Sequence, residues 1–367
     1  MKPEPFRIEP VFSPRIWGAH SLAPLFPDKA NLIEPIGEAW LTGLDCHIAT
    51  GTFSGKTLRE TWHQMPPEWR GQRFTESSDF PLLVKFIFPN DKLSIQVHPD
   101  DAYASAHEKA AGGRGKTEMW HAVSAEPGAQ VLVGLKPGVD KEKFLEGLAP
   151  HTLETLFQPH AVYAGDTFFV PAGTPHTIGP KMILCEVQQY SDLTYRVYDY
   201  GRLDAHGKPR ELHIEKALEV MRFGYTKGGK VPSLTLDSPE SGSGYGAKPY
   251  LPNRAADHKR KLLCACPYFA SERLEFSKRL EFPADSEHFR LLIVLNGRGN
   301  LGWPDSAARY NPGECWFLPG SLDLAALHPL QPTTLLRVYV PDLPALRQRL
   351  LDAGLPASAI SQSVFEI

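Results

Sequence analysis

Short segments with the alternating or apolar pattern of β-strands recur along the chain, separated by turn-forming residues. In the first half they are Leu82–Phe88, Lys92–Val97, Thr117–Val123, Gln130–Gly134, Thr167–Val170 and Met182–Gln188. Beyond residue 260 they are Leu262–Ala265, Ala270–Phe276, His288–Val294, Cys315–Leu318 and Thr334–Val340. The 34 Pro and 30 Gly residues favour turns over long helices. The spacing predicts a mainly β sandwich or closed barrel.

Two segments repeat one pattern. GDTFFVPAGTPH, residues 165–176, is similar to GECWFLPGSLDL, residues 313–324. Laying Gly313 on Gly165 without gaps places Leu324 where the first copy has His176. We therefore expect one barrel architecture used twice, with a chemically active first copy and a structural second copy. Residues 228–260 are rich in Gly, Ser, Pro and charge, and we interpret them as a linker or long loop.

Helical periodicity is confined to a few segments. They are Pro137–Gly147, Glu211–Phe223 and Leu343–Ala353, with a shorter one after Pro99. We expect them to form peripheral helices.

Charge and cysteine content limit which binding partners and which cellular compartment we expect. The net charge of −3 gives no reason to expect nucleic acid or a membrane surface as partner. The five cysteines form no CxxC pair, which argues against a disulfide framework and a thiolate zinc site. No charged-then-apolar leader opens the sequence, and no apolar run approaches the ~20 residues of a membrane span. We expect a cytoplasmic protein that is a monomer or weak homodimer.

The segment KLSIQVHPD, residues 92–100, carries the sharpest local signal. In a strand Leu93, Ile95 and Val97 face a core, while Gln96 and His98 share the opposite face about 6–7 Å apart. Two side chains so placed can bind one metal ion, whereas a helix would turn them away from each other. Taken alone, the segment also fits an ordinary polar strand face.

Two further segments supply matching ligands. GKTEMWHAV, residues 115–123, places Lys116 and Glu118 on one strand face, and VPAGTPHTIG places His176 directly after a Gly-Thr-Pro turn. With Gln96 and His98 they offer an amide oxygen, a carboxylate and two imidazoles. This set suits Zn²⁺, Fe²⁺ or Mn²⁺ better than Ca²⁺ or Mg²⁺. With no thiolate nearby, we expect a catalytic site with an open coordination position.

The first 200 residues resemble the class I mannose-6-phosphate isomerases, which are zinc-dependent cupin proteins. The matching motifs are PRIWG (14–18), GEAW (37–40), LLVKFIFPNDKLSIQVHPDD (82–101), GKTEMWH (115–121), FVPAGTPHTIG (169–179) and EVQQYSDLTYRVYDYGR (186–202). The resemblance implies zinc bound by Gln96, His98, Glu118 and His176, and an essential Arg196.

The resemblance also implies the architecture. We expect tandem cupin-like jelly-roll barrels with a few peripheral helices: a catalytic metal-binding domain over residues 1–227, and a barrel without metal over residues 261–367. The longest family members insert a helical domain between the glutamate and the second histidine ligand. Only 58 residues separate Glu118 from His176, so we expect the short bacterial form without that domain.

The expected activity is the interconversion of mannose 6-phosphate and fructose 6-phosphate through a cis-enediol. A guanidinium is a poor base, so Arg196 would bind the phosphate or stabilise the enediolate. A surface salt bridge of Arg196 with Asp192, Asp199 or Glu186 is the alternative.

Two lysines lie near the expected ligands. Burial beside a cation lowers a lysine pKa, so either Lys85 or Lys116 could carry a proton. We assign proton handling to Lys116, because it shares a strand face with Glu118. Lys85 and Ser94 are then expected to contact substrate, as is Glu186, which is also a competing base. Three tryptophans near these motifs are expected to pack in the core or rim, namely Trp17, Trp40 and Trp120.

Two other functions remain open. A metal-dependent cupin oxygenase would use similar ligands to hold Fe²⁺, although the Lys and Arg residues suit an anionic substrate. A non-catalytic sugar-binding regulator would lack ligands or the arginine, and here both are present. The second barrel is expected to serve as packing.

Overall fold

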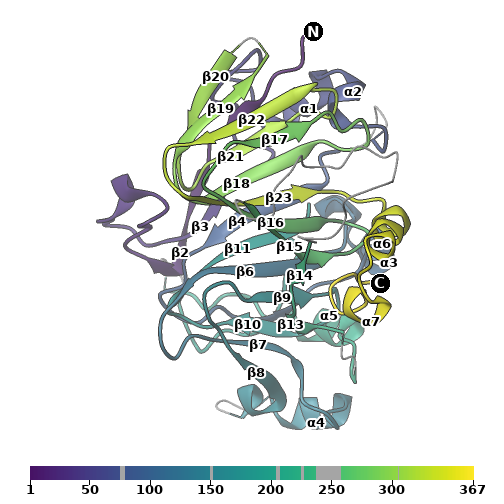
Figure 1. Cartoon of the computed structure of the whole chain (residues 1–367). Coiled ribbons are helices and arrows are strands. Elements are labelled where there is room, and N and C mark those ends of the chain that lie inside the picture. Colours follow the sequence, from purple (N-terminus) through teal and green to yellow (C-terminus); the bar gives the residue numbers. More distant parts are fainter. Residues whose placement is uncertain (75–78, 149–151, 204–206, 225–226, 237–257, 305) are drawn as a thin grey trace.

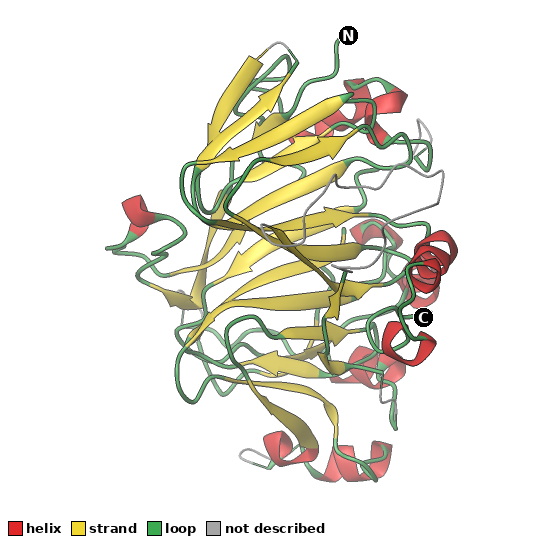
Figure 2. Cartoon of the chain, viewed as in Figure 1, coloured by secondary structure: helices red, strands yellow, loops and turns green. Residues whose placement is uncertain are grey.

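Two jelly-roll barrels lie against each other in the computed structural model, which describes residues 1–74, 79–148, 152–203, 207–224, 227–236, 258–304 and 306–367. The strands of both barrels run across the width of the molecule (Figure 1), and the helices lie at its periphery (Figure 2). Each barrel combines a seven-stranded sheet with a smaller sheet, of five strands in the first barrel and four in the second. The predicted mainly β fold is confirmed.

The first barrel is formed almost entirely by the first 231 residues. In sheet order its large sheet comprises β13 (Gly229–Val231), β9 (Thr167–Val170), β6 (Glu118–Ala125), β11 (Met182–Gln189), β4 (Leu82–Ile87), β3 (Ile36–Trp40) and β2 (Val11–Ala19). Its small sheet comprises β12 (Tyr195–Tyr198), β5 (Ile95–Val97), β10 (His176–Ile178), β7 (Gln130–Leu135) and β8 (Phe157–Ala161). Neighbouring strands in both sheets are antiparallel.

The second barrel repeats this topology. Its large sheet comprises β1 (Phe6–Ile8), β21 (Cys315–Leu318), β18 (Arg290–Asn296), β23 (Thr333–Tyr339), β16 (Ala270–Phe276), β15 (His258–Ala265) and β14 (Leu234–Thr235). Its small sheet comprises β17 (Leu280–Pro283), β22 (Leu324–Pro329), β19 (Gly299–Trp303) and β20 (Ser306–Tyr310). The repeated segments form β9 and β21, which hold the same place in the two sheet orders. His176 and Leu324 begin the equivalent strands β10 and β22, as the alignment predicted.

Alternation along the strands gives each large sheet two buried faces. In β6, Trp120 packs into the core inside the first barrel, whereas Met119 packs into the core between the barrels. In β18, Leu292 packs into the core inside the second barrel, whereas Leu291 packs into the core between the barrels. The shared core therefore joins the two large sheets back to back, which holds the barrels in one rigid arrangement.

Helices are short and begin at side-chain caps where the sequence provides them. They are α1 (Leu58–Gln64), α2 (Pro67–Arg70), α3 (Asp101–His107), α4 (Lys141–Glu146), α5 (Ile214–Val220), α6 (Leu343–Asp352) and α7 (Ala357–Ile360). Single-turn 3₁₀ helices span Pro27–Lys29, Lys109–Ala111 and Leu153–Leu156. Asp100, Asp140 and Asp342 each accept a backbone N–H in the first turn of α3, α4 and α6. All four predicted helices are present.

The described residues between Glu118 and His176 contain only α4 and one 3₁₀ turn as helical structure. The expectation of no large inserted helical domain is confirmed. Among the described residues, no helix combines the length and the apolar character that crossing a membrane requires.

Strands enter the segment that was predicted as linker or loop. Gly229–Val231 pairs with β9, Leu234–Thr235 pairs with β15, and β15 itself begins at His258. Edge pairing satisfies the backbone groups of these residues, which is why they are strands despite few large apolar side chains. Residues 237–257 of the expected linker lie outside the described residues. At the other end of the chain, β1 pairs with β21 of the second barrel, so the division at residues 227 and 261 stays a prediction.

Candidate active site

A cavity of about 360 Å³ opens at the first barrel, between the small sheet and the end of the large sheet. Six side chains that the sequence singled out line it: Lys85, Ser94, Gln96, Lys116, Glu186 and Arg196. The three remaining predicted ligands, His98, Glu118 and His176, are buried beside it, each at most 1% exposed. The structure therefore gathers all nine predicted site residues in one region.

Three ligand atoms converge in this region. One atom from each of His98, Glu118 and His176 lies within 4.8 Å of the other two. His98 follows β5, while Glu118 begins β6 and His176 begins β10. Gly173 has φ of 83° in the turn before His176, and its N–H donates to the His98 carbonyl at 2.8 Å. That positive φ requires glycine in practice, and the turn ties the two imidazole-bearing segments together.

Each imidazole is oriented through its Nδ1 atom. His98 Nδ1 lies 2.7 Å from the Leu193 carbonyl oxygen, and His176 Nδ1 lies 2.8 Å from that of Thr174. A carbonyl can only accept, so Nδ1 carries the proton and the Nε2 lone pair is available to a metal. Such backbone anchoring is typical of metal-binding histidines.

The Nε2 atoms point toward the Glu118 carboxylate. His98 Nε2 lies 3.2 Å from Oε1 and His176 Nε2 lies 3.8 Å from Oε2. Burial lowers the pKa of His176 to about 3 and also lowers that of His98, so both rings are neutral at pH 7. Burial opposes ionisation of Glu118, but the charge of Lys116 outweighs it and holds the pKa of Glu118 well below its usual range. His98 Nε2 is buried without a hydrogen-bond partner and faces Glu118 Oε1, which also contacts Lys116 Nζ at 3.1 Å. A divalent cation between them fits this donor set.

Gln96 lies opposite His176 in the β5–β10 pairing. Its amide Nε2 is 3.4 Å from His176 Nε2, and a half-turn of the amide would direct Oε1 to the same point. Gln96 is therefore placed to add the oxygen ligand that the sequence predicts.

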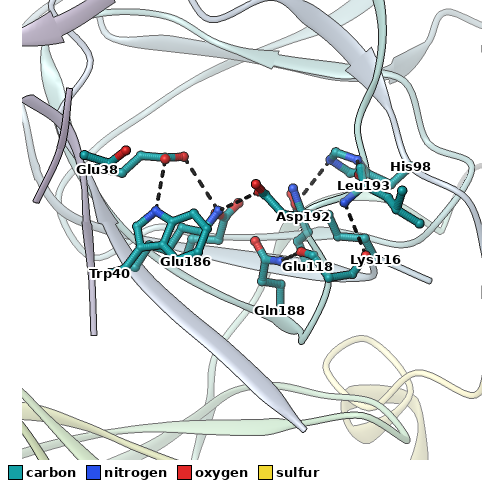
Figure 3. A network of polar contacts seen from close by, with 12 residues as sticks. Glu38, Trp40, His98, Lys116, Glu118, Glu186, Gln188, Asp192 and Leu193 are labelled. Carbon is teal, nitrogen blue, oxygen red and sulfur yellow. Dashed lines mark hydrogen bonds and ion pairs between the residues drawn. The ribbon is translucent and has the colours of Figure 1, made fainter. Parts of the chain in front are cut away.

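A second polar network surrounds Lys85, which is 2% exposed. Its Nζ lies 3.6 Å from Glu38, 3.9 Å from Glu186 and 3.6 Å from Asp192. Figure 3 labels these three acidic residues. Burial opposes the charge, but these carboxylates outweigh it and raise the pKa of Lys85. Burial by itself lowers the pKa of Lys85, as expected, but the net pKa is raised, so Lys85 stays an ammonium and does not become a proton carrier. The sequence could not show the three acids that meet it.

Tryptophans hold carboxylates in this network. Trp120 Nε1 donates to Glu186 at 2.9 Å and to Glu118 at 3.2 Å. Trp40 Nε1 donates to Glu38 at 3.1 Å, and its ring lies 4.6 Å from Lys85 Nζ. These side chains pack as expected, and in addition they orient acids of the site.

Comparisons with known proteins place the chain in a family. Residues 6–125 match the family model of the phosphomannose isomerase type I catalytic domain. The chain is 38% identical over 319 residues to "Probable mannose-6-phosphate isomerase GmuF" of Bacillus subtilis. The aligned region covers 86% of this chain and 93% of that protein. The chain belongs to the type I phosphomannose isomerase family.

Another relative and a solved structure are also mannose-6-phosphate isomerases by name. Mannose-6-phosphate isomerase of Streptococcus mutans is 31% identical over 340 residues, covering 89% of this chain and 98% of that protein. The crystal structure of the mannose 6-phosphate isomerase from Bacillus subtilis superposes with a TM-score of 0.78 at 28% identity, covering 91% of this chain and 99% of that one. The fold of this family member is thus that of a solved isomerase.

Arg196 of this phosphomannose isomerase family member faces the cavity and does not form the surface salt bridge that was the alternative. Its Nη1 donates to the Glu211 carbonyl at 2.9 Å, and it lies opposite Gln96 in the β12–β5 pairing. Asp199 pairs instead with Arg202 and Arg210, and Asp192 pairs with Lys85.

Several cavity residues escaped the sequence reasoning. They are Arg15, Glu38 and Arg210, which line the cavity with the predicted set. Arg15 and Glu38 lie in the motifs PRIWG and GEAW, and their side chains meet at 2.5 Å across β2 and β3. Their position inside these two motifs is the sequence signal that could have identified them as site residues. Arg210 gave none, because it follows a polar stretch without periodicity.

Proposed function

We propose that this chain interconverts mannose 6-phosphate and fructose 6-phosphate with a zinc ion bound by Gln96, His98, Glu118 and His176. The observation that carries the proposal is the buried convergence of His98, Glu118 and His176, with His98 Nε2 lacking a hydrogen-bond partner, beside a cavity lined by lysine and arginine. Neutral imidazoles and one carboxylate suit zinc, and the cationic lining suits a sugar phosphate.

A zinc ion at this point would supply positive charge to the oxygens on which negative charge develops. The protein residues supply the rest. Lys85 is a permanent ammonium, so it binds a hydroxyl or oxyanion of the sugar but cannot accept its proton. Ser94 is 3% exposed and lines the cavity, where its hydroxyl can bind the sugar. Arg196 is assigned to the phosphate or to the enediolate oxygen.

Proton transfer between C2 and C1 requires a group that can accept and return a proton. We assign this to Lys116, whose Nζ lies 3.1 Å from Glu118 Oε1 and borders the cavity. Glu186 is the second candidate on a specific observation. Burial and the nearby charge of Glu118 raise the pKa of Glu186 to about 8, which lies near the working pH that favours proton transfer.

One coupled assay tests the function. Mannose 6-phosphate turnover is measured on the purified protein, after chelation, and after adding back zinc. We expect loss on chelation and recovery with zinc. Turnover in the absence of oxygen separates an isomerase from an oxygenase. A protein that binds the sugar phosphate but never turns it over would support a regulator and contradict the proposal.

Substitution separates the two proton-transfer candidates. Solvent deuterium incorporation at C2 of the substrate is followed in Lys116→Met and Glu186→Gln. If Lys116 carries the proton, exchange is lost in Lys116→Met and retained in Glu186→Gln. The opposite pattern assigns the role to Glu186.

We further propose a cytoplasmic protein that is a monomer or weak homodimer. All five cysteines are buried as free thiols, which suits a reducing compartment. Light scattering across a concentration series tests the assembly, and a tight oligomer would contradict it.

A further inference from the structure

Three arginines gather where the small sheet of the first barrel ends. Arg196 lies in β12, and Arg202 and Arg210 follow it in the chain. Burial lowers the pKa of Arg196, and the nearby charges of Arg210 and Arg202 lower it further, against the opposing charge of Asp199. Such a concentration of like charge is costly unless an anion balances it.

One buried carboxylate is shared by two of these arginines. Asp199 accepts from Arg202 Nη2 at 2.6 Å and from Arg210 Nε at 2.7 Å, and it also accepts from Arg210 Nη2. Its side chain is 6% exposed. Burial opposes its charge, but hydrogen bonds from Arg210 and Arg202 outweigh burial and lower the pKa of Asp199. The two hydrogen bonds to Asp199 fix the plane of the Arg210 guanidinium.

The cavity connects this cluster to the metal-binding residues. Gln96 lies opposite His176 on one side and opposite Arg196 on the other, so one row crosses three strands. With strands about 5 Å apart, the row spans about 10 Å from His176 to Arg196. Arg210 lines the same cavity as Arg196. A six-carbon sugar with its reacting carbons near the metal thus extends its far end toward the arginines.

Charge distinguishes the two ends of the cavity. Lys85 is balanced by Glu38 and Asp192, each at 3.6 Å, and Lys116 by Glu118 at 3.1 Å. The arginine end has less compensation. Apart from Asp199, the carboxylate nearest Arg202 is that of Asp91 at 3.5 Å, which is 60% exposed. A phosphate dianion is therefore best accommodated at the arginine end.

We propose that Arg210 binds the phosphate of the substrate and that Asp199 is the positioning residue that orients it. The inference rests on the proposed function for its substrate. Asp199 accepts from Nε and Nη2 of the Arg210 guanidinium, which leaves Nη1 for a phosphate in the cavity that Arg210 lines. A guanidinium held in this way presents parallel N–H donors to phosphate oxygens with little loss of side-chain freedom.

The decisive measurement is the dissociation constant of inorganic phosphate, taken by calorimetry on the metal-loaded protein. Charge-assisted hydrogen bonds predict a loss of about 10- to 100-fold in Arg210→Met. Arg210→Lys keeps the positive charge but loses the planar pair of N–H donors. Its dissociation constant for phosphate is expected to lie between those of the unsubstituted protein and Arg210→Met. Arg279→Met is the matched control, because Arg279 pairs with Glu281 at 2.7 Å in the second barrel. It should match the unsubstituted protein.

Asp199→Asn separates positioning from net charge. Removing a negative charge from the cluster would tighten phosphate binding if only net charge mattered. Positioning predicts weaker binding, a higher KM for mannose 6-phosphate and a kcat that changes far less. Unchanged phosphate affinity in Arg210→Met and Arg210→Lys, or tighter binding in Asp199→Asn, overturns the proposal. Because phosphate binding is read without turnover, the result is independent of whether the isomerase assignment holds.

Discussion

Arg290 occupies in the second barrel the position that Glu118 occupies in the first. Glu118 lies opposite Val170 in the β6–β9 pairing, and Arg290 lies opposite Leu318 in the β18–β21 pairing. Val170 and Leu318 are equivalent in the repeated segments. A cation stands where the first barrel has the carboxylate that we propose as a metal ligand, and its charge opposes binding of a metal ion at the equivalent point.

The inversion extends across the sheet. The strand registers show three more positions at which equivalent residues of the two barrels carry opposite charges. They are Glu186 and Arg337, Lys85 and Glu272, and Glu38 and Arg260. Among the described residues, a carboxylate and two imidazoles converge in the first barrel only. The inversion of charge is a physical reason to expect no metal site in the second barrel.

The first prediction concerns metal content. His176→Leu copies the second barrel into the first and should lower bound zinc from one ion per chain to nearly none. Leu324→His places the imidazole in the second barrel but should leave the content at one ion, because Arg290 repels a second. Elemental analysis of both variants checks this. Two ions in Leu324→His would show that the charge inversion does not control metal binding.

Lys85 should matter for stability as well as for binding. In Lys85→Met the carboxylates of Glu38 and Glu186 lose a buried partner, which should lower the free energy of unfolding by about 3 kcal/mol. Lys92→Met removes a partly exposed partner of Glu154, at 2.8 Å, and should cost about 1 kcal/mol or less. Urea denaturation compares the two. Equal losses of unfolding free energy in the two variants would argue against a stabilising role of the buried network around Lys85.

Acid stability should depend on Glu272, which is fully buried. Burial opposes its charge, but Arg260 and Arg337 outweigh burial and lower the pKa of Glu272 from 4.5 to about 2. The folded pKa is depressed, so the stabilisation is present above pH 4.5 and is lost as the pH falls toward 2. It amounts to about 3 kcal/mol.

Glu272→Gln tests this assignment. The stability difference between Glu272→Gln and the unsubstituted protein should be largest near pH 6 and shrink between pH 4.5 and pH 2. Urea denaturation at several pH values within this window measures it. A difference that stays constant with pH would rule out Glu272 as the titrating group.

Arg196 should be required for efficient turnover. Removing a donor that meets developing or phosphate charge reduces kcat/KM by about 100-fold or more, so we expect that loss in Arg196→Ala. Zinc content should remain at one ion per chain, since Arg196 is not among the ligands. Steady-state kinetics with metal analysis checks both. Full activity in Arg196→Ala would place the anion-binding role on other residues.

The fold and the convergence of the proposed ligand residues were predictable because their signals are local. Alternation in residues 93–98 assigns faces, and a strand has only two faces, so Gln96 and His98 had to share one. The repeat around Gly165 and Gly313 indicated the second barrel, and the replacement of His176 by Leu324 there is the basis for the prediction that it holds no metal.

The polar networks were not predictable because they depend on strand registers. Lys85 meets Glu38 and Asp192 only after three separate segments pair, and no spacing in the sequence encodes that meeting. Arg210 likewise lines the cavity next to the bridge between Leu203 and Pro209, a pairing that the composition does not specify. The short strands at Gly229 and Leu234 depend on partners elsewhere in the chain, so their composition alone indicated a loop.

The most direct test of the account is anomalous diffraction at the zinc absorption edge from crystals of the metal-loaded protein. The account predicts one peak per chain, about 2.0–2.2 Å from His98 Nε2, His176 Nε2 and a Glu118 oxygen. An active protein whose only metal lies elsewhere, or that contains none, would contradict it.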